Sequence, residues 1–138
     1  RMKQQIQQKL KEALLQRDEL KTGTLRMLLA ALVNKEKEKR YKVSKENPSL
    51  EERELNEKAG LSDEEIFQVV ASEVKKRREA IEGFEKGGRT ELAEKEKKEM
   101  EVLKLYLPEQ LQADEIRQLA KEAIAKVGAQ SQKDFGRD

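Results

Sequence analysis

The chain has 138 residues, of which 42% are charged, 36% hydrophobic and 4% aromatic, a composition typical of exposed helices rather than of β-sandwiches. The 30 Lys and Arg residues nearly balance the 28 Asp and Glu residues, so the formal net charge of +2 provides no strong overall attraction for polyanions. The absence of Cys and His excludes disulfides, the common zinc sites, and catalytic groups of the Ser-His-Asp or Cys-His kind. The sequence therefore predicts an all-α protein with no metal site, no cofactor and no catalytic residues of its own.

Apolar residues recur at helical spacing in the first part of the chain and predict two helices, over roughly residues 2–17 and 19–42. The residues that carry this pattern are Ile6, Leu10, Ala13, Leu14, Leu25, Leu28, Leu29, Leu32 and Val33. Residues 41–60 contain Asn47-Pro48 and show no apolar period. We therefore expect a long loop there.

A capping-box sequence, Ser62 to Glu65, predicts the start of a third helix. The helix is expected to stop at Gly87-Gly88, because glycine favours the conformation that follows a helix C-terminus. A fourth helix follows and is ended by Pro108, and the glycine turn favours an antiparallel hairpin of the third and fourth helices. The inner faces of this hairpin are expected to consist of Ile66, Val70, Val74, Ile81, Phe84, Leu92, Met100, Leu103 and Leu107.

The last part of the chain predicts a fifth helix, over residues 113–127, with only ten residues after Gly128. We interpret residues 1–107 as an N-terminal helical bundle that contains the long hairpin, and residues 108–138 as a small C-terminal helical domain that is truncated at its end. The longest mainly apolar run, residues 25–33, is interrupted by Arg26 and is too short to span a membrane. No signal peptide is visible, so a cytoplasmic location is the default expectation.

Two clusters of basic residues are candidates for contacts with phosphate groups. The first lies within residues 35–45 and has a local net charge of +4, and the second is Lys75-Lys76-Arg77-Arg78. The alternative for the first cluster is a solvated helix end, where cations complement the helix dipole. We find no aromatic interleaving of the kind that single-strand-binding proteins use, so base stacking is not expected. The candidate nucleic-acid-binding residues are Lys35, Lys39, Arg40, Lys75, Lys76 and Arg78.

Arg77 and Glu96 are expected to have a structural role instead. At 100° per residue, Arg77 falls on the apolar face of the third helix and Glu96 on the apolar face of the fourth. In an antiparallel hairpin the two residues share the register of the apolar pairs, so we predict a bidentate ion pair within the bundle. Glu36, on the inner face of the second helix, is the alternative partner of Arg77.

The centre of the chain resembles the YqeY family. The residues that carry the resemblance are Lys75–Arg89, then Leu92, Glu96, Glu99 and Leu103, and then Tyr106–Leu111. Earlier and later landmarks are Leu25-Arg26-Met27-Leu28 with Ala31 and Asn34, and Gly128-Ala129 with Ser131, Asp134 and Gly136. The resemblance covers nearly the whole chain.

The resemblance implies an all-helical protein linked to tRNA-dependent amidation, because the YqeY family is related to the tail domain of GatB, a subunit of glutamine-dependent aminoacyl-tRNA amidotransferases. It implies tRNA or an amidotransferase-type complex as the partner. Three functions remain open: a non-catalytic accessory module that binds tRNA or such a complex, a component of a carbon–nitrogen ligase that uses glutamine as amide donor, and a helical protein–protein adaptor without RNA. The oligomeric state is not predicted.

Overall fold

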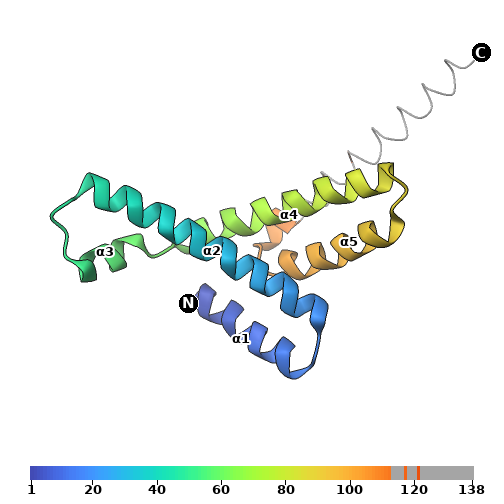
Figure 1. The fold of residues 1–138 in the computed structure, drawn as a ribbon, viewed down its shortest axis with the longest axis horizontal. Helices are drawn as coiled ribbons and strands as arrows, with labels where there is room; N and C mark the ends of the chain where they lie inside the picture. Colours follow the sequence, from blue (N-terminus) through green and yellow to red (C-terminus); the bar gives the residue numbers. More distant parts are fainter. Residues whose placement is uncertain (113–116, 118–120, 122–138) are drawn as a thin grey trace, which may run out of the picture. The chain divides into compact units, whose positions relative to one another are not determined.

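The computed structural model describes residues 1–112, 117 and 121 of the chain. It divides into two compact units, residues 1–106 and residues 107–138, and each is considered by itself. The described part contains five bounded helices and no β-strand, so the all-α class is confirmed (Figure 1). The helix predicted over residues 113–127 lies almost entirely outside the described residues. The five helices are α1 (Met2–Leu15), α2 (Glu19–Glu46), α3 (Glu52–Ala59), α4 (Asp63–Lys86) and α5 (Thr90–Lys104).

The long helix α2 is the centre of the first unit and packs against α1, α3, α4 and α5 (Figure 1). The turn before it places Arg17 at a positive φ of 56°, and the Asp18 side chain caps the helix by accepting a hydrogen bond from the amide of Lys21 at 3.1 Å. The fully buried core residues come from α1, α2, α4 and α5, as the apolar spacing predicts. They include Ile6, Leu25, Leu28, Leu32, Val70, Val74 and Leu103.

The prediction of a long loop over residues 41–60 is wrong. The helix α2 continues to Glu46, and the short helix α3 folds back beside the C-terminal half of α2 (Figure 1). Only Ala59 of α3 is buried, which explains why the segment shows no apolar period. Acidic residues in the first turn, Glu52 and Glu54, favour the helix through its dipole instead.

The helices α4 and α5 form the predicted antiparallel hairpin (Figure 1). Both hydrogen bonds of the capping box are present, from the Glu65 amide to the Ser62 hydroxyl and from the Ser62 amide to the Glu65 carboxylate. The hairpin turns at Gly88, whose φ of 71° strains any residue with a Cβ atom.

One detail of the predicted hairpin is wrong. Leu92 is 40% exposed, whereas its neighbour Ala93 is 1% exposed, so the inner face of α5 runs through Ala93, Met100 and Leu103. The apolar pattern alone favoured the larger side chain, but a small residue allows the two helices to approach closely near the turn. Two other residues assigned to apolar stripes, Leu14 and Val33, also lie at the surface.

Candidate functional site

A surface groove of about 350 Å³ lies between α2 and α4. Its two walls come from separate parts of the sequence, so the groove could not be predicted from the sequence of either helix alone. Most of its side chains are polar, and several are solvent-exposed. The lining residues are Ala31, Asn34, Lys35, Glu38, Gln68, Val69, Ser72, Glu73 and Lys76.

The groove brings together one lysine from each basic cluster, Lys35 from α2 and Lys76 from α4. Each lysine has a carboxylate on its own helix: Lys35 Nζ lies 3.8 Å from Glu38, and Lys76 Nζ lies 3.3 Å from Glu73. The Lys35–Glu38 pair is solvent-accessible and contributes little to stability, so Lys35 can exchange partners at small cost. Lys76 is itself exposed, whereas its partner Glu73 is buried and also pairs with Arg77. The groove therefore offers two cations, the carboxylate of Glu38 and the polar groups of Asn34, Gln68 and Ser72 to a ligand.

The other candidates from the first basic cluster have partners within the chain. Lys39 Nζ donates hydrogen bonds to the Gly60 carbonyl at 2.7 Å and to Glu65 Oε1 at 2.6 Å. Arg40 donates to the side chain of Asn56 and lies 4.0 Å from Glu52. These two residues fasten α3 and the start of α4 to α2, which the sequence analysis did not foresee.

In the second cluster, Lys75 and Lys76 are exposed on α4. Arg78 is half-buried and interacts with other groups of the chain. Four consecutive residues point in different directions around a helix, so only part of the cluster can face one ligand. Of the six candidate residues, Lys35 and Lys76 line this groove, whereas Arg40 lines a separate cavity between α2 and α3.

The link between Lys39 and Glu65 predicts a pH dependence of stability. The hydrogen bond from Lys39, followed by that from the Ser62 amide, lowers the pKa of Glu65 from 4.5 to about 2. A carboxyl group with a lowered folded-state pKa contributes stability above its unfolded pKa, and this contribution is lost as the pH falls from about 4.5 to about 2. Thermal unfolding of the parent protein and of Glu65→Gln should therefore differ most near neutral pH and converge toward pH 2.

The matched control for this experiment is Glu57→Gln, which removes an exposed carboxylate from a surface pair with Arg53 on α3. That variant should differ little from the parent at any pH. A difference between the parent and Glu65→Gln that stays constant down to pH 2 would contradict the role of the ionised Glu65.

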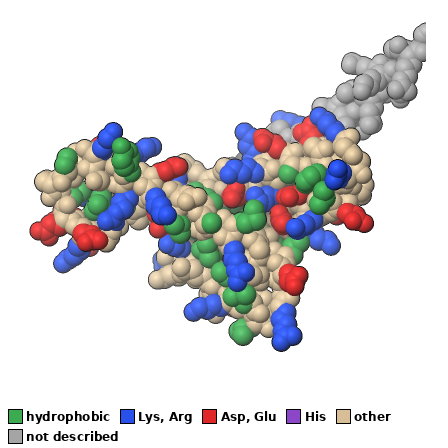
Figure 2. Space-filling view, viewed as in Figure 1, with side chains coloured by type: hydrophobic (Ala, Val, Ile, Leu, Met, Phe, Trp, Pro, Cys, Tyr) green, Lys and Arg blue, Asp and Glu red, His purple; other side chains and the backbone are tan. Residues whose placement is uncertain are grey.

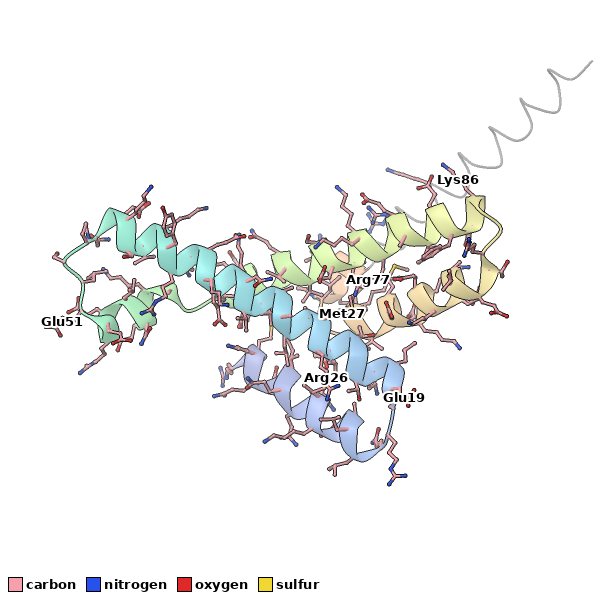
Figure 3. All side chains as sticks on the ribbon, in the orientation of Figure 1. Glu19, Arg26, Met27, Glu51, Arg77 and Lys86 are labelled. Carbon is pink, nitrogen blue, oxygen red and sulfur yellow. The ribbon has the colours of Figure 1, made fainter. Side chains whose placement is uncertain are left out.

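Arg77 is buried between α4, α2 and α5 rather than facing solvent. Its Nε lies 3.8 Å from Glu96 and 3.5 Å from Glu99, and its Nη1 lies 3.7 Å from Glu73. Its Nη2 donates to the sulfur of Met27 at 3.4 Å, and Figure 3 shows Arg77 and Met27 facing each other. The pair with Glu96 is therefore not bidentate, and Arg77 is shared by three carboxylates.

Two members of this cluster, Glu73 and Glu99, were not predicted from the sequence. The spacing contained a signal for both, because Glu73 precedes Arg77 by one helical turn and Glu99 follows Glu96 by three residues. The alternative partner, Glu36, pairs with Lys3 of α1 instead, at 2.8 Å.

The cluster holds more negative than positive charge. Burial, and then the neighbouring Glu99, raise the pKa of Glu96 above its ordinary value. A carboxyl group with a raised folded-state pKa stabilises the fold as the pH falls through that pKa, which is opposite in sign to the effect of Glu65. Arg77 thus offsets only part of the repulsion among its three neighbours.

The described part of the chain contains neither a metal-binding group nor a membrane-spanning helix. No group of three or more Asp and Glu side chains there is arranged to hold a metal ion. No helix in that part is long and apolar enough to cross a membrane.

Comparison with known proteins gives matches over most of the chain. Residues 3–50 and 47–137 match the family described as Yqey-like protein. The chain is 33% identical over 102 residues to the altered inheritance of mitochondria protein 41, mitochondrial, of Eremothecium gossypii, an alignment that covers 74% of this chain and 46% of that protein. It is also 42% identical over 48 residues to an uncharacterized protein of Schizosaccharomyces pombe, covering 35% of this chain and 39% of that protein. The chain spans less than half the length of these relatives.

Proposed function

The chain belongs to the YqeY family, and from this premise we propose that it is a non-catalytic accessory module that binds tRNA through the groove between α2 and α4. The observation that supports the proposal is the presence of Lys35 and Lys76, from two separate basic clusters, in one groove. The relation of the family to the GatB tail favours tRNA as the partner over other polyanions.

The chemistry of the groove fits RNA better than a bare polyanion. Two lysines are suited to phosphate oxygens, and Asn34, Gln68 and Ser72 can donate hydrogen bonds to phosphate or ribose oxygens. The exposed carboxylate of Glu38 repels phosphate but accepts hydrogen bonds from ribose 2′-hydroxyl groups and base amino groups. This balance predicts weak binding that depends strongly on salt.

The distribution of charge over the surface supports the same conclusion. On the face shown in Figure 2, Lys and Arg side chains are interspersed with Asp and Glu, without one continuous basic patch. Attraction for RNA would therefore be local to the groove. The alternative of a carbon–nitrogen ligase component receives no support from the groove, whose ionisable side chains are only Lys and Glu.

The proposed function does not depend on the cellular compartment of the protein. One relative is named as a mitochondrial protein, so a cytoplasmic location does not follow from the family. RNA binding of the proposed kind is compatible with either compartment.

The proposal predicts that Lys35→Ala combined with Lys76→Ala weakens tRNA binding and flattens its salt dependence. Each lost phosphate contact should lower the slope of log affinity against log salt by about 0.9, so the double variant should lose up to about 2. Fluorescence anisotropy with a labelled tRNA transcript between about 20 and 200 mM salt measures both quantities.

The control is Lys9→Ala combined with Lys86→Ala, which removes the same charge from exposed surface pairs with Glu12 and Glu82. An equal loss in the control would show that only net charge matters and would contradict the groove. If the parent protein binds no tRNA even at the lowest salt, the proposal itself fails, and a pull-down with and without nuclease would then identify a protein partner.

A further inference from the structure

Tyr41 presents its ring to solvent at the C-terminal half of α2. The residue is 62% exposed, and Lys45 Nζ lies over the ring, 5.3 Å from its centroid. Single exposed aromatic residues are common and need no explanation. Among the aromatic residues of the first unit, however, Tyr41 is the exposed one, because Phe67, Phe84 and Tyr106 are each partly buried.

Tyr41 lies on the face of α2 that forms one wall of the groove. Asn34, Glu38, Tyr41 and Lys45 follow one another by four, three and four residues, which is the spacing of one helix face. Asn34 and Glu38 line the groove. At 1.5 Å per residue, Tyr41 stands about 10 Å beyond Asn34 along the helix axis.

The surroundings of Tyr41 combine exposed cations with a fixed backbone. Lys37, Lys42 and Lys45 are exposed next to it on α2. Between them, Lys39 and Arg40 bond to residues 56, 60 and 65, which holds this part of α2 against α3 and the start of α4. The ring is therefore presented by a rigid helix among side chains that can reach phosphates.

We infer that Tyr41 is a stacking platform for an unpaired base of the RNA whose backbone lies in the α2–α4 groove. The inference rests on the proposed function and specifies its ligand as single-stranded nucleotides rather than a continuous duplex. A base stacks on an aromatic ring more favourably than an exposed lysine does, so it displaces Lys45, which then contacts a phosphate. This inference departs from the expectation from sequence that base stacking plays no part.

The chain offers a direct spectroscopic test, because it contains two Tyr and no Trp. In a Tyr106→Phe background, Tyr41 is the remaining tyrosine, and its ring protons can be followed by NMR. Titration with a short oligouridine should shift these signals upfield, as expected for a ring stacked on a base. An abasic oligonucleotide of the same length supplies the phosphates alone and should leave the ring signals in place.

The affinity measurement complements the spectra. Tyr41→Ala should weaken binding of oligouridine roughly tenfold and leave binding of the abasic oligonucleotide unchanged. Oligouridine that binds with unshifted Tyr41 signals, or with equal affinity for Tyr41→Ala, would overturn the platform but leave the proposed groove intact. Absence of any oligonucleotide binding at low salt, together with absence of tRNA binding, would overturn the proposed function and the platform with it.

Discussion

Arg77→Met is expected to lower the free energy of unfolding by about 3–5 kcal/mol. The variant keeps an apolar side chain of similar length but leaves Glu73 and Glu99, both buried, without the cation that they share with Glu96. Carboxylates that already repel one another would then have to be protonated or hydrated for the protein to fold. Urea denaturation measures the loss, and the melting temperature should fall by roughly 10–20 °C.

The control for Arg77 is Arg53→Met, which makes the same substitution at an exposed residue of α3. It should change the free energy of unfolding by no more than about 0.5 kcal/mol. Adding Glu73→Gln and Glu99→Gln to Arg77→Met should restore much of the lost stability, because no unpaired charge remains at either residue. A loss below about 1 kcal/mol for Arg77→Met would show that the cluster is hydrated and that burial of the charges is not the cause.

Replacing Glu96 is expected to change the stability of the protein differently from replacing Arg77, although the predicted ion pair gave the two residues the same role. Its side chain is the most exposed of the three carboxylates around Arg77, and its pKa is raised by burial and by Glu99. Replacement by Gln removes a repulsive charge and leaves Arg77 with Glu73 and Glu99. Arg77 and Glu96 therefore do not contribute equally to stability.

Leu32→Ala is expected to cost about 2–5 kcal/mol of unfolding free energy. Leu32 is completely buried on α2, next in sequence to the groove residue Ala31, and truncation leaves a cavity that the surrounding helices fill only in part. Because α2 also carries Asn34 and Lys35, the same variant should weaken tRNA binding if the groove requires a rigid α2. Denaturation and anisotropy on one preparation measure the two effects.

Leu15→Ala is the matched control for Leu32→Ala, since it makes the same change at a residue that is 86% exposed. It should alter stability by no more than about 0.5 kcal/mol and leave tRNA binding as it is in the parent protein. Equal costs for the two leucine variants would mean that Leu32 is not part of a close-packed core.

The features that could be predicted from the sequence are those that depend on local chemistry. The Ser62 capping box and the stop at Gly87-Gly88 each follow from a few neighbouring residues, and both are present. The burial of Arg77 followed from helical spacing alone. That Arg77 is shared by three carboxylates depends on how closely α4 and α5 approach each other. The spacing of residues in the sequence does not determine this distance.

The features that could not be predicted depend on contacts between distant segments. The helix α3 buries a single alanine, so its sequence has no apolar signal, and polar contacts to α2 help to hold it. Lys39 and Arg40 were assigned to phosphate contacts because a cluster of cations in the sequence shows where positive charge lies, but not toward which partner each side chain points. Likewise, the meeting of Lys35 and Lys76 in one groove follows from the packing of α2 against α4.

The way in which α3 is attached has a consequence for local unfolding. Its release would expose one buried alanine and break polar contacts such as that of Arg40 with Asn56, whereas release of α4 or α5 would open the core. The helix α3 is therefore expected to open at a lower free energy than α4 or α5, and no residue of α3 lines the α2–α4 groove. The two segments of the family match meet at residues 47–50, in the connection that leads into α3. Insertions at this connection should consequently be tolerated while the groove keeps its shape.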